Sequence, residues 1–401
     1  MERASESRHF FILIAAIGAL AIFSSTLSKT PVLPLFAADL GATPQEIGWI
    51  VIASTIPGIL ISFPAGAISD FFGKRRVIVA SLVIFATAPF LYLLVAESWQ
   101  LMAVRFYHGF ATAIFNTVAT AALAAQYPQR RAAVLSTYSS VTIVGHSIAP
   151  FLGGLLISVA NFQSVYWACA VSGVLAFAVG LMLPAEPARA QTTVRFPPFF
   201  AALRDVLSSR AIVLTSLVEA AQFLVFGAVE AFLALYAVSV GIPPWQIGII
   251  LGVQLLSVIV VKPLMGNLSD RLGRRAIIFP GLALGVVGVA LLPLTANVFV
   301  LSLLSVLYGA AFATVTSSTT ALVADVTKNG QFGASVGVLR TIMDVGQTIG
   351  PVLMGFLIAG WGYGVGFPVL AMVIAASAIL FVFVPKGANS PASPPRPRAR
   401  R

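Results

Sequence analysis

Long apolar segments separated by short polar breaks run along almost the whole chain. Each segment has roughly 20 residues or more, the length that a helix needs to cross a bilayer. Strands of alternating polar and apolar residues, the pattern of a membrane barrel, do not occur. The pattern predicts an all-α polytopic membrane protein with twelve transmembrane helices, at residues 10–40, 45–69, 77–96, 99–125, 133–159, 164–184, 211–240, 245–268, 276–295, 298–323, 333–359 and 364–384.

The first half of this pattern recurs in the second half. When the chain is shifted by 200 residues, about 15 of the 46 positions between 33 and 78 are identical. Duplicated membrane bundles usually carry a substrate site between them. A polar, Pro-containing stretch at 185–209 separates the repeats. We therefore expect two pseudo-symmetric six-helix bundles, 1–184 and 210–386, a cytoplasmic linker at 185–209, and a disordered basic tail at 387–401.

Composition and charge agree with a membrane protein and fix its expected orientation. Hydrophobic residues make up 59% of the chain and charged residues 9%, which is too little polar surface for a soluble protein. Of the 24 Lys and Arg residues, 20 fall in loops or termini on one side. Positive loops stay inside, so both termini are predicted to be cytoplasmic, in a bacterial inner membrane. The net charge of +11 follows from this topology and needs no nucleic acid.

Charged and titratable residues inside the spans are the functional candidates, because each is expensive in a bilayer unless paired or hydrated. Segment 211–240 carries Glu219, Gln222, Phe223, Phe226 and Glu230 on one helical face, a stripe expected to face a hydrated cavity. Segment 99–125 has a comparable stripe. Segment 298–323 adds Tyr308 and hydroxyls from Thr314 to Thr320, either cavity lining or helix packing. The other candidates are Lys29, Arg105, His108, Thr112, Asn116, His146, Arg340 and Asp344.

Four of these candidates have alternatives. Lys29 reaches the outer interface if its helix ends near Pro31; if the helix continues to Leu40, Lys29 lies inside and pairs with Glu230. Asp344 is either a structural residue neutralised by Arg340, one turn away on the same helix, or a functional acid. The histidines His108 and His146 are packed, hydrogen-bonded residues in one interpretation and proton carriers in the other. Cys/His clusters for a metal, nucleotide loops and catalytic nucleophile arrangements do not occur, so we expect neither cofactor nor enzymatic activity.

A short motif follows the second helix of each half. It reads Gly66-x-x-x-Asp70-x-x-Gly73-Lys74-Arg75 and Gly266-x-x-x-Asp270-x-x-Gly273-Arg274. The second glycine of each copy permits a tight turn, and the first permits close helix approach. Each Asp ends a helix beside its own negative C-terminus, so it should face a positive group. For Asp70 that group is a following basic residue or Arg340, which would latch the halves; a plain topology signal is the alternative.

This doubled motif resembles the signature of the major facilitator superfamily. Two further segments resemble its drug/proton antiporter branch: Leu101 to Gly109, which contains Arg105 and His108, and the segment with Gly145, Pro150, Gly153 and Gly154. His108 stands where the branch usually has Gln, and Ala149 where it has Gly. The resemblance implies transport by alternating access, with Arg105 holding the fourth helix against the first and assisting proton coupling.

Taken together, the sequence predicts a monomeric, proton-coupled exporter of small amphipathic or drug-like molecules, the activity of multidrug resistance. The proton would bind first at Glu230 or Glu219, with Asp344, Arg105 and His108 as further coupling candidates. A proton-coupled importer or facilitator of a small organic anion, bound by Lys29, Arg105 and Arg340, is the first alternative. The second is a membrane sensor that keeps the fold without transport.

Overall fold

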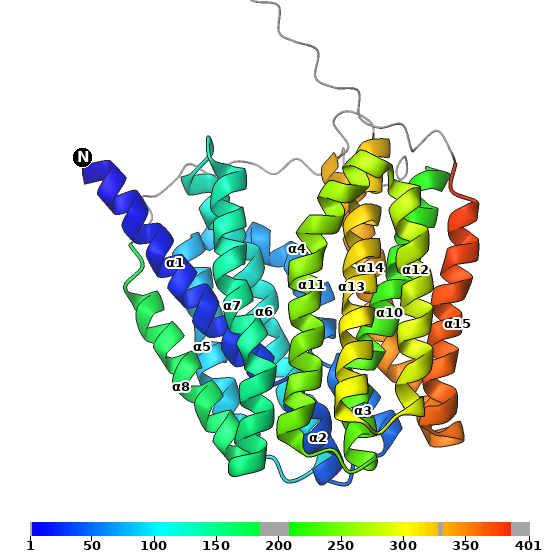
Figure 1. Ribbon diagram of the computed structural model, residues 1–401. Coiled ribbons are helices and arrows are strands. Elements are labelled where there is room, and N and C mark those ends of the chain that lie inside the picture. Colours follow the sequence, from blue (N-terminus) through cyan, green and yellow to red (C-terminus); the bar gives the residue numbers. More distant parts are fainter. Residues whose placement is uncertain (1, 185–207, 328–331, 386–401) are drawn as a thin grey trace, which may run out of the picture.

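The computed structural model describes residues 2–184, 208–327 and 332–385, apart from a few side chains that include Asp70. Within these ranges the secondary structure is entirely helical (Figure 1). The first half contains α1 (Glu2–Leu27), α2 (Val32–Asp39), α3 (Pro44–Ile52), α4 (Thr55–Phe72), α5 (Lys74–Tyr92), α6 (Ser98–Gln126), α7 (Arg131–Val159) and α8 (Phe162–Leu181). The second contains α10 (Arg210–Ser239), α11 (Pro244–Leu272), α12 (Arg274–Leu291), the 3-10 turn η1 (Leu292–Leu294), α13 (Val298–Val326), α14 (Phe332–Trp361) and α15 (Tyr363–Val382).

The twelve predicted spans are present, but the first two are each broken into two helices. The first span is α1 followed by α2, and the second is α3 followed by α4. By length and hydropathy, eleven segments of the described chain could cross a membrane. The span that these criteria omit is α6, whose apolar face is interrupted by Arg105, His108 and Asn116. This helix corresponds to the apolar stretch predicted at 99–125, and its polar residues make it a candidate functional helix.

Prolines lie next to both helix breaks of the first half. Pro31 lacks the backbone N–H that would bond to the last residue of α1, and Pro57 lacks the one that would bond to Ala53, the residue after α3. The corresponding residues of the second half, at the 200-residue offset, are Ala231 and Ser257. Accordingly α10 and α11 continue without interruption. The repeat therefore conserves the helix order but not the continuity of the first two spans.

The predicted turn geometry is confirmed at both copies of the repeat. Gly73 and Gly273 adopt φ values of 89° and 90°, which permit the sharp turn between consecutive helices. Thr43 and Glu46 form a capping box at the start of α3, with the Thr43 N–H donating to Glu46 Oε2 at 2.7 Å. These local signals fix where the helices begin and end.

The helices form two pseudo-symmetric bundles that use the same internal contacts. In the first, α1 packs on α7, α4 on α6, and α5 on α8. The matching pairs in the second are α10 with α14, α11 with α13, and α12 with α15. The two bundles meet through a second symmetric set of contacts, α7 with α11 and α3 with α14. Helix order and packing thus give the architecture that the sequence predicts, although the exact boundaries of the two units stay a prediction.

The bundles touch each other at one end and diverge toward the other (Figure 1). We call the end with α2 and the start of α3 the closed end, and the end where α1 begins the open end. At the closed end, a Cβ on Gly248 would lie 2.6 Å from Pro150 O, and one on Gly48 would lie 2.7 Å from Pro351 O. Gly266, toward the open end of α11, has open space instead. The close helix approach expected at Gly266 is therefore not found here, since the bundles have separated at that end.

Packing within each bundle predicts one stability difference. In the contact between α8 and α5, a Cβ on Gly173 would lie 2.9 Å from the carbonyl carbon of Phe85. Gly173→Leu should lower the free energy of unfolding by about 1–3 kcal/mol through overpacking. Gly360→Leu is the matched control, because nothing lies within 4 Å of the corresponding Cβ. Thermal unfolding in detergent compares the two. Equal midpoints for both variants would show that α5 and α8 are not closely packed.

Candidate functional site

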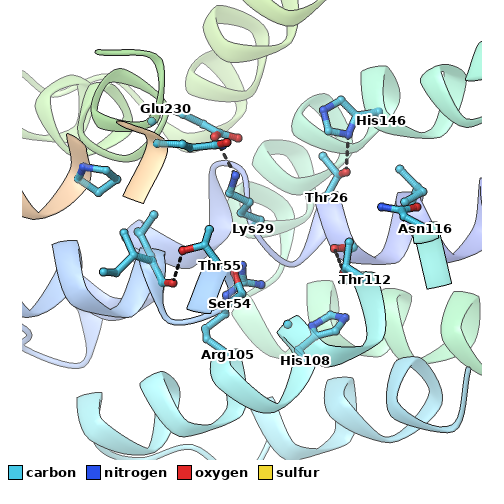
Figure 2. A pocket seen from close by; sticks show the side chains of 18 residues that line it. Thr26, Lys29, Ser54, Thr55, Arg105, His108, Thr112, Asn116, His146 and Glu230 are labelled. Carbon is cyan, nitrogen blue, oxygen red and sulfur yellow. Dashed lines mark hydrogen bonds and ion pairs between the residues drawn. The ribbon is translucent and has the colours of Figure 1, made fainter. Parts of the chain in front are cut away.

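A cavity of about 290 Å3 lies between the bundles, beside the break between α1 and α2. Its walls come from α1, α3, α4, α6 and α7 of the first bundle and from α10 and α14 of the second. Figure 2 shows that most of the labelled polar side chains around it belong to the first bundle. Of the predicted cavity residues, Lys29, Thr112, Asn116 and His146 line it, together with Arg105, His108 and Glu230. Four further polar residues of the first bundle line the cavity and were not predicted: Ser25, Thr26, Ser54 and Thr55.

Lys29 and Glu230 form an ion pair that joins the two bundles. The ammonium nitrogen of Lys29 lies 2.8 Å from Glu230 Oε2, and the Thr30 hydroxyl donates to Oε1 at 2.7 Å. The exposed fractions are 30% for the Lys29 side chain and 18% for Glu230. Lys29 lies in the break between α1 and α2, so neither predicted course of the first helix is correct as stated. The expected pair nevertheless forms, because the break turns Lys29 toward the second bundle (Figure 2).

Arg105 is buried in the cavity wall, with an exposed fraction of 3%. It donates to Ser54 Oγ at 2.7 Å and to the Tyr92 hydroxyl at 3.4 Å. Ser54 lies in the break between α3 and α4, and Tyr92 ends α5. The family resemblance implied a link between the fourth helix and the first. Instead, Arg105 links the fourth helix to the second and third, because the break at Ser54 places a hydroxyl within reach.

The two histidines of the cavity have different surroundings. His146 Nδ1 lies 2.8 Å from Thr26 Oγ1, so it is held by a hydrogen bond between α7 and α1. His108 Nδ1 lies 3.4 Å from the Tyr92 hydroxyl, and its Nε2 has no hydrogen-bond partner within the described residues. Figure 2 shows both rings at the cavity, from opposite walls. Both histidines fit the packed, hydrogen-bonded interpretation, and His108 is the more deeply buried, with the rings of Phe85 and Tyr92 against it.

The stripe on α10 faces mainly α13 rather than the cavity. Glu219 is buried and accepts hydrogen bonds from Thr319 at 2.8 Å and Thr320 at 3.3 Å. Two hydroxyls of the predicted cluster in 298–323 thus hold the Glu219 carboxylate inside the second bundle. Within the described residues no cation lies within ion-pair distance of Glu219. Glu219 and Glu230 therefore occupy separate environments on one helix.

The remaining residues of the stripe pack against aromatic neighbours. Phe226 stacks on Phe312 with ring centroids 4.3 Å apart and also contacts Tyr308, and Phe223 meets Phe312 edge to face. Gln222 is buried, and neither atom of its amide has a partner among the described residues. The expectation that this whole face is hydrated is wrong in this conformation, because α13 covers it. Only Glu230, at the end of the stripe, reaches the main cavity.

Asp344 and Arg340 do not neutralise each other. The ion pairs of the described chain do not include either residue. Asp344 is half-buried and Arg340 is exposed on the same helix, α14. An exposed guanidinium can be hydrated, which removes the need for a carboxylate partner. The predicted one-turn pair is therefore not formed.

The loop motif makes a charge cluster in the second bundle. Arg274 contacts Asp270, as expected for a following basic residue, and its Nε also lies 2.9 Å from Asp325 Oδ2. Asp325 ends α13 and escaped the sequence analysis, although an acid beside a helix end facing basic loops was a usable signal. In the first copy, Gly66 and the side chain of Asp70 lie outside the described part. The Asp70–Arg340 latch stays a prediction.

The motif of the fifth helix forms close contacts on two sides of α7. Gly145 and Gly153 face α1 and the segment after it: their Cβ atoms would lie 2.9 Å from Ala19 O and 3.0 Å from Val32 Cγ2. Gly154 lies against Gly248 of α11, and the carbonyl of Pro150 also faces Gly248. Small residues on both faces thus let α7 pack against its own bundle and the other one.

Comparison with known proteins gives a consistent family. The model of the Major Facilitator Superfamily matches residues 13–253 and 215–401. An uncharacterized MFS-type transporter of Methanocaldococcus jannaschii is 25% identical over 82% of this chain and 86% of its own. The multidrug resistance protein MdtG of Proteus mirabilis is 24% identical over 86% and 88%. A bacterial homolog of the human lysosomal transporter Spinster has a similar fold, with a TM-score of 0.78, 17% identity, and coverage of 94% and 95%.

The ion pair between the bundles predicts a thermodynamic coupling. Replacing either Lys29 or Glu230 by Gln should destabilise the protein by about 1–3 kcal/mol, less than a fully buried pair because both side chains are partly exposed. The exchanged variant Lys29→Glu with Glu230→Lys should recover part of the loss. Unfolding midpoints of the single, double and exchanged variants measure the coupling. Additive losses with no recovery would mean that the contact contributes no interaction free energy.

Proposed function

The chain belongs to the major facilitator superfamily, and we propose that it is a secondary active transporter that exports small amphipathic molecules in exchange for protons. The observation that carries this proposal is the Lys29–Glu230 pair, which links the bundles at the closed end and borders the cavity. Transporters with repeated bundles move substrate by rocking one bundle against the other around a central site. A contact between the bundles can then depend on which side is open.

The orientation of the open end follows from the charged loops. With both termini in the cytoplasm, the open end of the bundles faces the cytoplasm and the closed end faces outward. The structure then corresponds to a state in which substrate enters from the cytoplasm. We infer a monomer in a bacterial inner membrane, since the two bundles of one chain supply every wall of the cavity.

Glu230 is the proposed proton carrier, because its charge partner lies on the other bundle. In the present state, the Lys29 ammonium and the Thr30 hydroxyl both donate to its carboxylate. Opening of the closed end would pull Lys29 away and leave Glu230 exposed to the outside, where it binds a proton. Reclosure brings the ammonium back and releases the proton toward the cavity. Proton movement is thereby tied to the rocking of the bundles.

Glu219 is the second acid of the proposal, and its partners differ in kind. Its carboxyl is held by Thr319 and Thr320, which are in the same bundle and keep their places as the bundles rock. Glu219 keeps the same partners in every state, whereas Glu230 loses Lys29 when the bundles separate. Protonation of Glu219 is therefore less directly linked to alternating access. The geometry therefore ranks Glu230 before Glu219.

Export of amphipathic molecules is supported by one relative and by the cavity. The relative from Proteus mirabilis bears the name multidrug resistance protein. The cavity combines the polar side chains with apolar ones, among them Ile22, Val51 and Ile52. A mixed lining of this kind suits a molecule with an apolar body and a polar group.

Transport assays in proteoliposomes test the proposal. Ethidium, thymidine and benzenesulfonate serve as cationic, neutral and anionic probes, and an enclosed pH dye follows protons. An accepted probe should drive protons the opposite way across the membrane. Glu230→Gln should abolish this movement with folding unchanged, and Glu219→Gln should reduce it less. Asp39→Asn, which removes an exposed carboxylate at the end of α2, is the control.

Three results would contradict parts of this proposal. Unchanged proton movement in Glu230→Gln would remove Glu230 from the coupling. Probe and proton moving in the same direction would favour an importer. A complete lack of flux with every probe would favour a membrane sensor.

A further inference from the structure

Arg105 forms no ion pair with the residues that the structure describes. Its side chain is almost fully buried, and its hydrogen bonds go to two neutral hydroxyls, those of Ser54 and Tyr92. Its Nε is buried without any partner in the same part of the chain. A guanidinium stays charged under physiological conditions, so this cation is uncompensated within the described residues.

Glu230 is not available to compensate it. Glu230 is the single carboxylate among the described residues that line the cavity. Its two oxygens already accept from Lys29 and Thr30. An unpaired charge inside a membrane protein typically marks a substrate or ion pathway and has a specific partner. None of the ion pairs among the described residues supplies that partner for Arg105, which leaves its place open to a bound anion.

The surroundings of Arg105 provide further hydrogen-bond donors. His108 Nε2 is buried without a partner in the described structure, and His108 is almost completely buried. Both residues come from α6 and line the cavity, as do Thr112 and Asn116, one and two turns further along. Figure 2 shows Arg105 and His108 together on one side of the cavity, with Thr112 and Asn116 farther along. The α6 wall is therefore a row of polar groups that begins with a cation.

Size and shape limit what this wall can bind. The volume of about 290 Å3 is at the lower limit of the range typical for ligand pockets. Phe, Tyr and Trp do not occur among the described lining residues, so the cavity lacks the aromatic surfaces on which large planar cations stack. Apolar contacts come instead from Ile22, Val51, Ile52 and Pro351.

We propose that the cavity binds a small organic anion whose carboxylate pairs with Arg105 and whose apolar body lies against the aliphatic side chains. A guanidinium matches a carboxylate through two parallel N–H···O bonds, a geometry that lysine lacks. His108 and the polar residues of α6 accept or donate the remaining hydrogen bonds. This inference rests on the proposed transport function and names its substrate class.

Equilibrium binding without a pH gradient tests the substrate class separately from transport. Benzoate and benzamide have nearly the same shape, but only benzoate is charged at neutral pH. Calorimetry with the full chain in nanodiscs should give benzoate an affinity about tenfold or more above that of benzamide. Arg105→Gln should remove this preference, and Arg105→Lys should retain only part of it. Arg131→Gln removes an exposed arginine at the start of α7 and should leave the preference unchanged.

Each outcome decides the inference. Equal affinity for the two probes, or binding of neither to the wild-type protein, overturns it, as does a full benzoate preference in Arg105→Gln. If Arg105→Gln does not fold, the test relies on two other results. These are the benzoate preference of the wild-type protein and its partial loss in Arg105→Lys. Benzoate preference in a protein that moves no protons would keep this inference and remove proton exchange. Proton movement driven only by ethidium or thymidine would keep proton exchange and overturn the inference that the substrate is an organic anion.

Discussion

The ion pair between Lys29 and Glu230 is the interaction on which this arrangement depends. Lys29 lies between α1 and α2, where the first span is broken, so its ammonium is not part of a continuous apolar helix. Pairing with Glu230 compensates both charges and at the same time fastens the first bundle to the second. The helix break, the pair of charges and the contact between the bundles therefore depend on one another. Since the pair spans two bundles that are proposed to rock, its energy depends on the transport state.

The duplicated scaffold and the unduplicated charges have different tasks. Equivalent helices make equivalent contacts in both bundles, and Gly73 and Gly273 turn the chain in the same way. The breaks at Pro31 and Pro57, by contrast, occur in one bundle only, and the cavity takes most of its polar lining from that bundle. The second bundle contributes Glu230 to the cavity and keeps Glu219 inside. The cavity is therefore asymmetric although the helical frame around it is symmetric.

Much of this could be predicted from the sequence, for identifiable reasons. Hydropathy and the repeat gave the twelve spans, and the cost of charge in a membrane pointed to Lys29, Arg105 and Glu230. Two kinds of feature were missed. Helix breaks were readable from Pro31 and Pro57, because the repeat has no proline at those places in the second half. The sequence could not predict that the polar stripe on α10 faces α13, since this depends on which neighbouring helix covers that face. Asp325 had a usable signal that was overlooked, whereas Ser54 became visible only through its contact with Arg105.

The central claim is that the Lys29–Glu230 pair keeps the closed end of the two bundles together. Distances between spin labels, measured by pulsed electron resonance with Cys169 replaced, test it most directly. One label pair at Asp39 and Ser239 reports the closed end, and another at Arg131 and Arg271 reports the open end. Neutralising Glu230 with Gln at constant pH should lengthen the first distance and shorten the second. Unchanged distance distributions at both ends would contradict the claim.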